Sequence, residues 1–212
     1  MLMVVACLTM LIDHVGLLFF PEQAVFRVIG RVAMPIYAYL LVRGYVNTKS
    51  ISKYFRRVLT IALLSQMPYM IMVDKTKLNI CFTWLLGMIV IDGLSNKDRN
   101  TAINIMMVVG SLLLSIFIPM DYGIYAVLWV LLLLFRNKIG GYAGNILMVI
   151  GAFAIYALCN NPIQICGMIA IPIIIIFEKK KLVRLKCGMS KHIYHLFYPV
   201  HMMILDIIKI FL

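Results

Sequence analysis

Four ionisable side chains lie close together near the start of the chain, inside two long apolar runs. They are Asp13, His14, Arg27 and Arg31. An ionisable group at membrane depth is costly, and it is therefore a candidate for function. A histidine accepts a proton at physiological pH, and an arginine supplies a permanent positive charge for an oxyanion or a phosphate. Together these residue types favour acyl transfer by general-base catalysis.

The sequence carries none of the common alternative signatures. The HExxH of metalloproteases, the GxGxxG of dinucleotide-binding proteins and the phosphate-binding P-loop are all absent from it. No serine, cysteine or lysine stands out as a covalent nucleophile, and the five cysteines form no CxxC pair. We therefore expect neither a covalent route nor a metal site.

The composition is that of a membrane protein. Of the 212 residues, 64% are hydrophobic and 13% are charged, which is outside the range of soluble domains of this size. The apolar runs show no period-2 alternation, so the spans are expected to be helices and not barrel strands. We predict an all-α fold, a polytopic membrane helical bundle that forms a single domain over residues 1–212. The nine predicted spans are 1–20, 24–43, 54–73, 79–94, 101–118, 122–135, 140–159, 162–178 and 191–211.

Basic residues gather in alternate connections between these spans. The connections 43–57, 95–100, 136–138 and 178–191 hold most of the positive charge of a chain whose formal net charge is +12. The positive-inside rule then predicts a cytoplasmic N-terminus and an outside C-terminus in the cell (inner or plasma) membrane. Some of these charges are open to a second use in binding an anionic ligand or membrane lipid. We expect no nucleic-acid partner.

The rise of a helix places three of the ionisable residues near one level. At 1.5 Å per residue, His14 and Arg31 lie about 20 Å from the cytoplasmic side, and His201 about 15 Å. Arg27 lies four residues before Arg31 and shares its helix face. Tyr198 likewise shares a face with His201. We expect the first, second and last spans to bring these side chains together.

Purely structural roles are the alternative for each residue. Asp13 can form a buried ion pair with Arg27 or Arg31 that holds the first two spans together. His14 or His201 can stay neutral and donate to a backbone carbonyl. A structural role for all of them at once is disfavoured, because apolar residues would pack equally well without the cost of desolvation.

Three motifs carry a resemblance to a known family: IDHVGLLFF at 12–20, RVIGRVAMP at 27–35 and FYPVH at 197–201. With the segments between them, they resemble the TraX family over nearly the whole chain. The founding member of that family N-acetylates the mature pilin of conjugative F-type pili. The family is related to the acyltransferase-3 superfamily of integral membrane acyltransferases. The resemblance implies acetyl-CoA as a cytoplasmic acyl donor and an acceptor near the outer face.

The resemblance also implies roles for individual residues. His14 and Asp13 would be the catalytic pair, with Asp13 orienting His14. Arg27 and Arg31 would bind the donor or stabilise the oxyanion. His201 would line the site and is the rival base.

Further positions are implied less directly. Asn79 and Thr83 would line the site beside the bound donor, together with Tyr198. Asp121 and Tyr122, in the turn DYG, would shape the entrance for the acceptor.

The chain departs from the family pattern at two positions. Arg43 stands where typical members have a glutamate in LLVEG, and Gln66 stands where they often have one in SEIP. These two missing carboxylates leave the identity of the acceptor open.

We expect an integral membrane acetyltransferase whose acceptor is the N-terminal amine of a pilin-like or secreted peptide, or a hydroxyl of a glycan. A second hypothesis is a transporter or channel that uses the same charges as a path. A third is a non-catalytic structural component of a conjugation apparatus, in which the polar residues only lock helices together.

Overall fold

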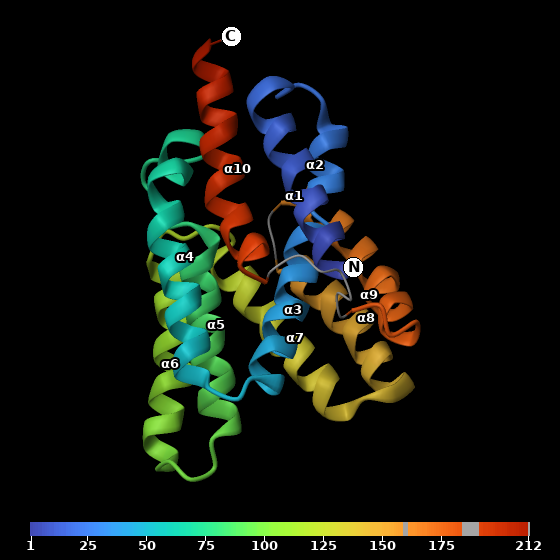
Figure 1. Cartoon of the computed structure of the whole chain (residues 1–212). Helices are drawn as coiled ribbons and strands as arrows, with labels where there is room; N and C mark the ends of the chain where they lie inside the picture. Colours follow the sequence, from blue (N-terminus) through green and yellow to red (C-terminus); the bar gives the residue numbers. More distant parts are fainter. Residues whose placement is uncertain (159–160, 184–190, 212) are drawn as a thin grey trace.

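The chain is helical in the parts that the structure describes, which are residues 1–158, 161–183 and 191–211, without the side chains of 191–195. In this computed structural model the elements follow the chain as a bundle (Figure 1). They are α1 (Leu2–Phe19), α2 (Ala24–Gly30), α3 (Ala33–Asn47), α4 (Ile51–Met72), α5 (Ile80–Ser95), α6 (Thr101–Phe117), α7 (Gly123–Ile139), α8 (Gly141–Ala157), the 3-10 helix η1 (Pro162–Ile169), α9 (Ala170–Lys179) and α10 (Lys191–Phe211).

Each of the nine predicted spans falls on helix, with residue 159 outside the described residues. Two ends differ for local reasons. α4 begins at Ile51, earlier than predicted, because the hydroxyl of Ser50 caps it by accepting from the Lys53 backbone N–H at 3.4 Å. α7 continues past the apolar run through charged residues to Ile139, where Gly140 ends it with φ +68°.

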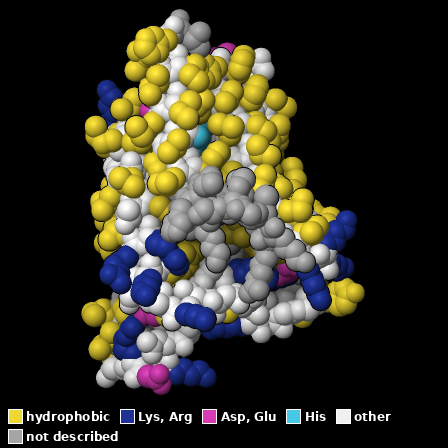
Figure 2. Space-filling model, in the orientation of Figure 1, with side chains coloured by type: hydrophobic (Ala, Val, Ile, Leu, Met, Phe, Trp, Pro, Cys, Tyr) yellow, Lys and Arg dark blue, Asp and Glu magenta, His cyan; other side chains and the backbone are white. Residues whose placement is uncertain are grey.

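Three helical segments are long and apolar enough to cross a membrane by length and composition. They are Leu2–Phe19, Ala24–Asn47 and Pro162–Lys179. Ile80–Ser95, Thr101–Phe117 and Gly141–Ala157 are shorter apolar helices. In Figure 2 hydrophobic side chains cover the upper part of the face shown, and Lys and Arg side chains gather in its lower part.

The second predicted span is broken between α2 and α3, at Arg31 and Val32. Pro35 explains the position of the break, because it has no N–H to donate to the Arg31 carbonyl. Gly167 of η1 packs against this freed carbonyl so closely that a Cβ on Gly167 would lie 3.2 Å from the Arg31 oxygen. The break therefore turns Arg31 into the last residue of a short helix.

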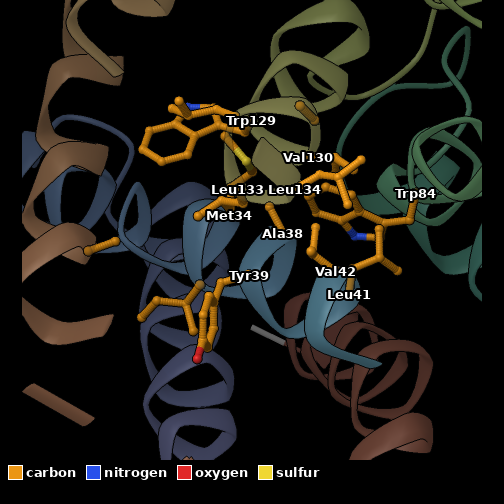
Figure 3. Packing of buried hydrophobic residues seen from close by; sticks show 14 of the residues in the cluster. Met34, Ala38, Tyr39, Leu41, Val42, Trp84, Trp129, Val130, Leu133 and Leu134 are labelled. Carbon is orange, nitrogen blue, oxygen red and sulfur yellow. The ribbon is translucent and has the colours of Figure 1, made fainter. Parts of the chain in front are cut away.

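The core lies between α3, α5 and α7. Trp129, Leu133 and Leu134 of α7 pack against α3, and Trp84 of α5 packs beside the later turns of α3 (Figure 3). Trp129 is 1% exposed, so the largest side chain in the protein is fully buried here. This packing fixes α3, and with it the helix break that carries Arg31.

α10 lies between α1 and α4 (Figure 1). Tyr69 and Met72 of α4 form a small second core with Met202 and Leu205 of α10. α10 therefore stands beside α1, which brings together segments from the two ends of the chain.

α1 and α2 approach each other unusually closely because each contributes a glycine. A Cβ on Gly16 would lie 2.1 Å from the Cβ of Phe26. A Cβ on Gly30 would lie 2.1 Å from Oδ1 of Asp13. No side chain larger than hydrogen fits at either position without moving its neighbours.

The change Gly30→Ala is expected to lower the free energy of unfolding by roughly 1–3 kcal/mol, because the added methyl group displaces the Asp13 carboxylate. Thermal unfolding of the purified protein in detergent measures this. Gly110→Ala in α6 is the matched control, since a Cβ there would meet nothing within 4 Å. Equal behaviour of the two variants would contradict the close approach of α1 and α2.

Candidate functional site

Asp13 of α1 binds both arginines of the RVIGRVAMP segment. Its Oδ2 lies 2.9 Å from Nη1 of Arg27, and its Oδ1 lies 3.2 Å from Nη2 of Arg31. Asp13 and Arg31 are buried, at 8% and 6% exposed. Charge-assisted hydrogen bonds of this kind are strong, and here two cations share one anion.

Arg31 is held in place by more than its ion pair. Its Nε donates to the Arg27 carbonyl at 3.3 Å. Its guanidinium carbon lies 5.5 Å from the centre of the Tyr122 ring, at the start of α7. Arg31 thus contacts side chains from α1 and from the 118–122 turn, which makes it the centre of the cluster.

His14 of α1 faces His201 of α10. The Nδ1 of His14 lies 2.8 Å from the Nε2 of His201, and the ring planes are 4° apart. The Nδ1 of His201 lies 2.6 Å from the Phe197 carbonyl oxygen. The predicted convergence of the first, second and last spans is confirmed as geometry.

These contacts assign the protons of the neutral pair. A carbonyl oxygen only accepts, so Nδ1 of His201 carries a proton and donates it to Phe197. Nε2 of a neutral His201 is then the acceptor, and Nδ1 of His14 is the donor. The Nε2 of His14 is left unprotonated, and His14 is partly exposed. This nitrogen is the proton acceptor that a general base needs.

The expected orientation of His14 by Asp13 is not what the structure has. Asp13 points to Arg27 and Arg31, whereas His14 points to His201. Adjacent residues on a helix lie about 100° apart around its axis, and the two guanidiniums are the stronger partners for a carboxylate. His201 therefore holds the ring of His14, and Asp13 holds the arginines.

Two other predicted residues lie at the edges of this arrangement. The ring of Tyr198 lies 6.0 Å from that of His201 and packs against the cores on both sides of α10. The buried hydroxyl of Thr83 donates to the Asp121 carbonyl at 2.9 Å. Thr83 thus fixes the 118–122 turn, a role that its position in the sequence did not indicate.

The sequence matches known proteins over its length. A family model described as TraX protein matches residues 1–209. The chain belongs to the TraX family. It is also similar to the "Probable fimbrial assembly protein FimC, serogroup H1" of Dichelobacter nodosus. The two are 25% identical over 240 residues, which cover 100% of this chain and 95% of that protein. No solved structure matches.

Gln66, where TraX proteins often have a glutamate, forms a link that needs an amide. Its Oε1 accepts from the backbone and side-chain amides of Asn79, at 3.0 and 2.9 Å. Its Nε2 donates to the Lys77 carbonyl at 2.9 Å. A glutamate would place a second oxygen against that carbonyl, so the amide suits this connection.

Asn79, predicted as a donor-binding residue, serves as the N-cap of α5. Its Oδ1 accepts from the Cys81 backbone N–H at 3.0 Å. Its two amide hydrogens are used by Gln66 and by the Ala62 carbonyl, at 2.9 and 2.7 Å. With no amide hydrogen left, Asn79 ties α4 to α5 in this structure.

A second charged cluster was missed by the sequence analysis. Glu178 of α9 forms ion pairs with Arg136 of α7 and, at 3.8 Å, with Arg43 of α3. It also accepts from the Tyr39 hydroxyl at 2.7 Å, and Arg136 donates to Asn145 of α8 at 2.9 Å. The sequence signal was present in the single acidic residue beside a basic connection, but it was interpreted as topology.

The change Asp13→Asn is expected to destabilise the TraX chain by about 3 kcal/mol, because it leaves two guanidiniums without their anion. Equilibrium unfolding in detergent measures the loss. Asp98→Asn removes an exposed carboxylate and should stay within about 0.5 kcal/mol of the parent. A loss no larger than that of Asp98→Asn would show that the cluster contributes nothing to stability.

Proposed function

We propose that the chain is an integral membrane acetyltransferase that moves an acetyl group from acetyl-CoA to an acceptor amine or hydroxyl. The contact between His14 and His201 supports this most, because it leaves Nε2 of His14 free to accept a proton. A merely structural histidine pair would need no free nitrogen. The TraX resemblance supplies the reaction class.

We infer that the chain crosses the membrane nine times, with the N-terminus inside and the C-terminus outside. The distribution of Lys and Arg toward one part of the molecule supports this arrangement (Figure 2). The Met1 amino group also donates to the Leu182 carbonyl at 3.2 Å. The N-terminus therefore lies beside the basic connection that follows α9, as this topology requires.

In the proposed reaction the acceptor nitrogen or oxygen attacks the thioester carbonyl carbon. Nε2 of His14 takes the proton that the acceptor loses, and the imidazolium is stabilised through its Nδ1–H, which donates to His201. The C–S bond then breaks, and His14 returns the proton to the departing thiolate. The products are the acetylated acceptor and CoA with a free thiol.

Arg27 and Arg31 would stabilise the negative charge on the carbonyl oxygen or hold the donor. Asp13 neutralises only one of the two guanidinium charges. The cluster thus keeps one positive charge in a water-poor site, where it acts strongly on a developing oxyanion. Asp13 contributes by fixing the arginines and makes no contact with the histidines that the described residues show.

The name of the D. nodosus relative links that protein to fimbrial assembly. For this chain we propose a pilin-like or secreted peptide as the acceptor, with a glycan hydroxyl as the alternative. The same name also favours a second candidate function, a non-catalytic membrane component of pilus assembly. Activity measurements separate the two, because the second candidate releases no CoA.

Purified protein with acetyl-CoA and a peptide acceptor is expected to release CoA thiol, and His14→Gln should lower the rate by about 10²–10⁴-fold. His201→Ala should lower it less, because His14 keeps its free nitrogen but loses its hydrogen-bond partner. Asp98→Asn is the control and should keep the parental rate. Undiminished thiol release by His14→Gln would remove His14 from the mechanism, and the absence of release by the parent would favour the assembly component.

A further inference from the structure

The 118–122 turn between α6 and α7 is tied down on both sides of Asp121. The Asp121 N–H donates to the Leu78 carbonyl at 2.8 Å, and the Leu78 N–H donates to Pro119 at 3.0 Å. The Asp121 carbonyl accepts from Thr83, as described above. The backbone of Asp121 is therefore fixed by a second connection and by α5, and its side chain leaves from a defined point.

The next residue adopts a backbone conformation that carries strain. Tyr122 has φ +59° and Gly123 has φ +41°. The left-handed region is unfavourable for a side chain as bulky as tyrosine. A Cβ at position 123 would lie 2.9 Å from the Ser115 carbonyl. Strain of this kind persists where the surrounding structure imposes it, and it gathers at binding and catalytic sites.

The carboxylate of Asp121 has no hydrogen-bond or ion-pair partner among the described residues, although its side chain is only partly exposed. Asp13 and Asp74 both have direct ionic partners. Burial raises the pKa of Asp121 to about 6, while the positive charges of Arg31, Lys77 and Arg27 lower it and the charge of Asp13 raises it. A buried carboxylate without a partner calls for an explanation.

The charges around Asp121 indicate what kind of partner is missing. Arg31 and Arg27 already share Asp13, and Lys77 pairs with Asp74 at 2.9 Å. None of these cations contacts Asp121 directly within the described residues. The missing partner is thus a cation that arrives from outside the chain, small enough to reach a side chain at the start of α7.

We propose that the Asp121 carboxylate binds the ammonium group of the acceptor, so that this TraX protein acts on amines and not on hydroxyls. This inference rests on the proposed acetyl transfer. Attack by an amine creates an oxyanion and a positively charged nitrogen together, whereas attack by a hydroxyl with loss of its proton creates only the oxyanion. Arg27 and Arg31 suit the first charge, and Asp121 suits the second.

The test is a binding measurement without acetyl-CoA. The probes are an alanine tripeptide amide with a free amino group and the same peptide N-acetylated, and thermal stabilisation of the purified protein is the signal. The free amine should bind the parent, and the acetylated peptide should not. Asp121→Asn should weaken amine binding by about ten- to a hundred-fold, the loss of one charge-assisted hydrogen bond.

Asp74→Asn is the matched control. It removes an exposed carboxylate from the neighbouring 73–79 connection, where Asp74 pairs with Lys77, and it should leave amine binding unchanged. The isosteric Asn keeps both backbone contacts of position 121, and the elution volume in size exclusion checks its folding.

The parent provides a second measurement through pH. Binding of the free amine should rise as pH rises through about 6, as Asp121 loses its proton, and fall above about 8, as the peptide amine loses its charge. The groups that act on Asp121 electrostatically are Arg31, Arg27, Asp13, Lys77, Tyr122, Tyr69, Tyr198 and Cys81.

Equal binding of the free and acetylated peptides, undiminished binding by Asp121→Asn, or no binding of the free amine by the parent would each overturn the ammonium site. An Asp121 that serves only as a counter-charge would lower stability in Asp121→Asn without changing the preference for a free amine. Failure of the acetyltransferase proposal is separate, because it appears as a lack of CoA release while amine binding persists.

Discussion

The pairing of charge inside an apolar bundle is the constraint on which this structure depends. An unpaired charge in such surroundings is too costly to keep, so Asp13 must meet Arg27 and Arg31. That contact requires α1 and α2 to approach each other, and the glycines at 16 and 30 permit it. The helix break before Pro35 then ends α2 where Arg31 can turn toward both Asp13 and Tyr122.

The two ionisable sets in α1 have different partners because of their rotation around the helix. Asp13 faces α2, and His14 faces α10, which enters the bundle between α1 and α4. The first and last helices therefore supply the proton acceptor, and the second supplies the positive charge. A general base and an oxyanion stabiliser can act on one group only if they come from different sides, and this division of partners provides that.

The helices and the meeting of His14 with His201 could be predicted from the sequence, whereas most individual contacts could not. Hydropathy marks apolar runs, and the constant rise of a helix converts position into depth, so residues near one level were identified. Rotation about the axis and competition between partners are not encoded in that way. The choice of Asp13 for the arginines and the use of Asn79 as a cap depend on them. The cluster around Glu178 was missed for the same reason.

The two positions that depart from the TraX pattern illustrate how a local partner changes the meaning of a residue. Gln66 donates to the Lys77 carbonyl, which a carboxylate cannot do. Arg43 lies beside Glu178, so a carboxylate is still present there but comes from α9. Both residues lie outside the contacts among Asp13, Arg27, Arg31, His14 and His201. The missing glutamates therefore alter connections between helices, and the groups proposed to carry out acetyl transfer keep their own partners.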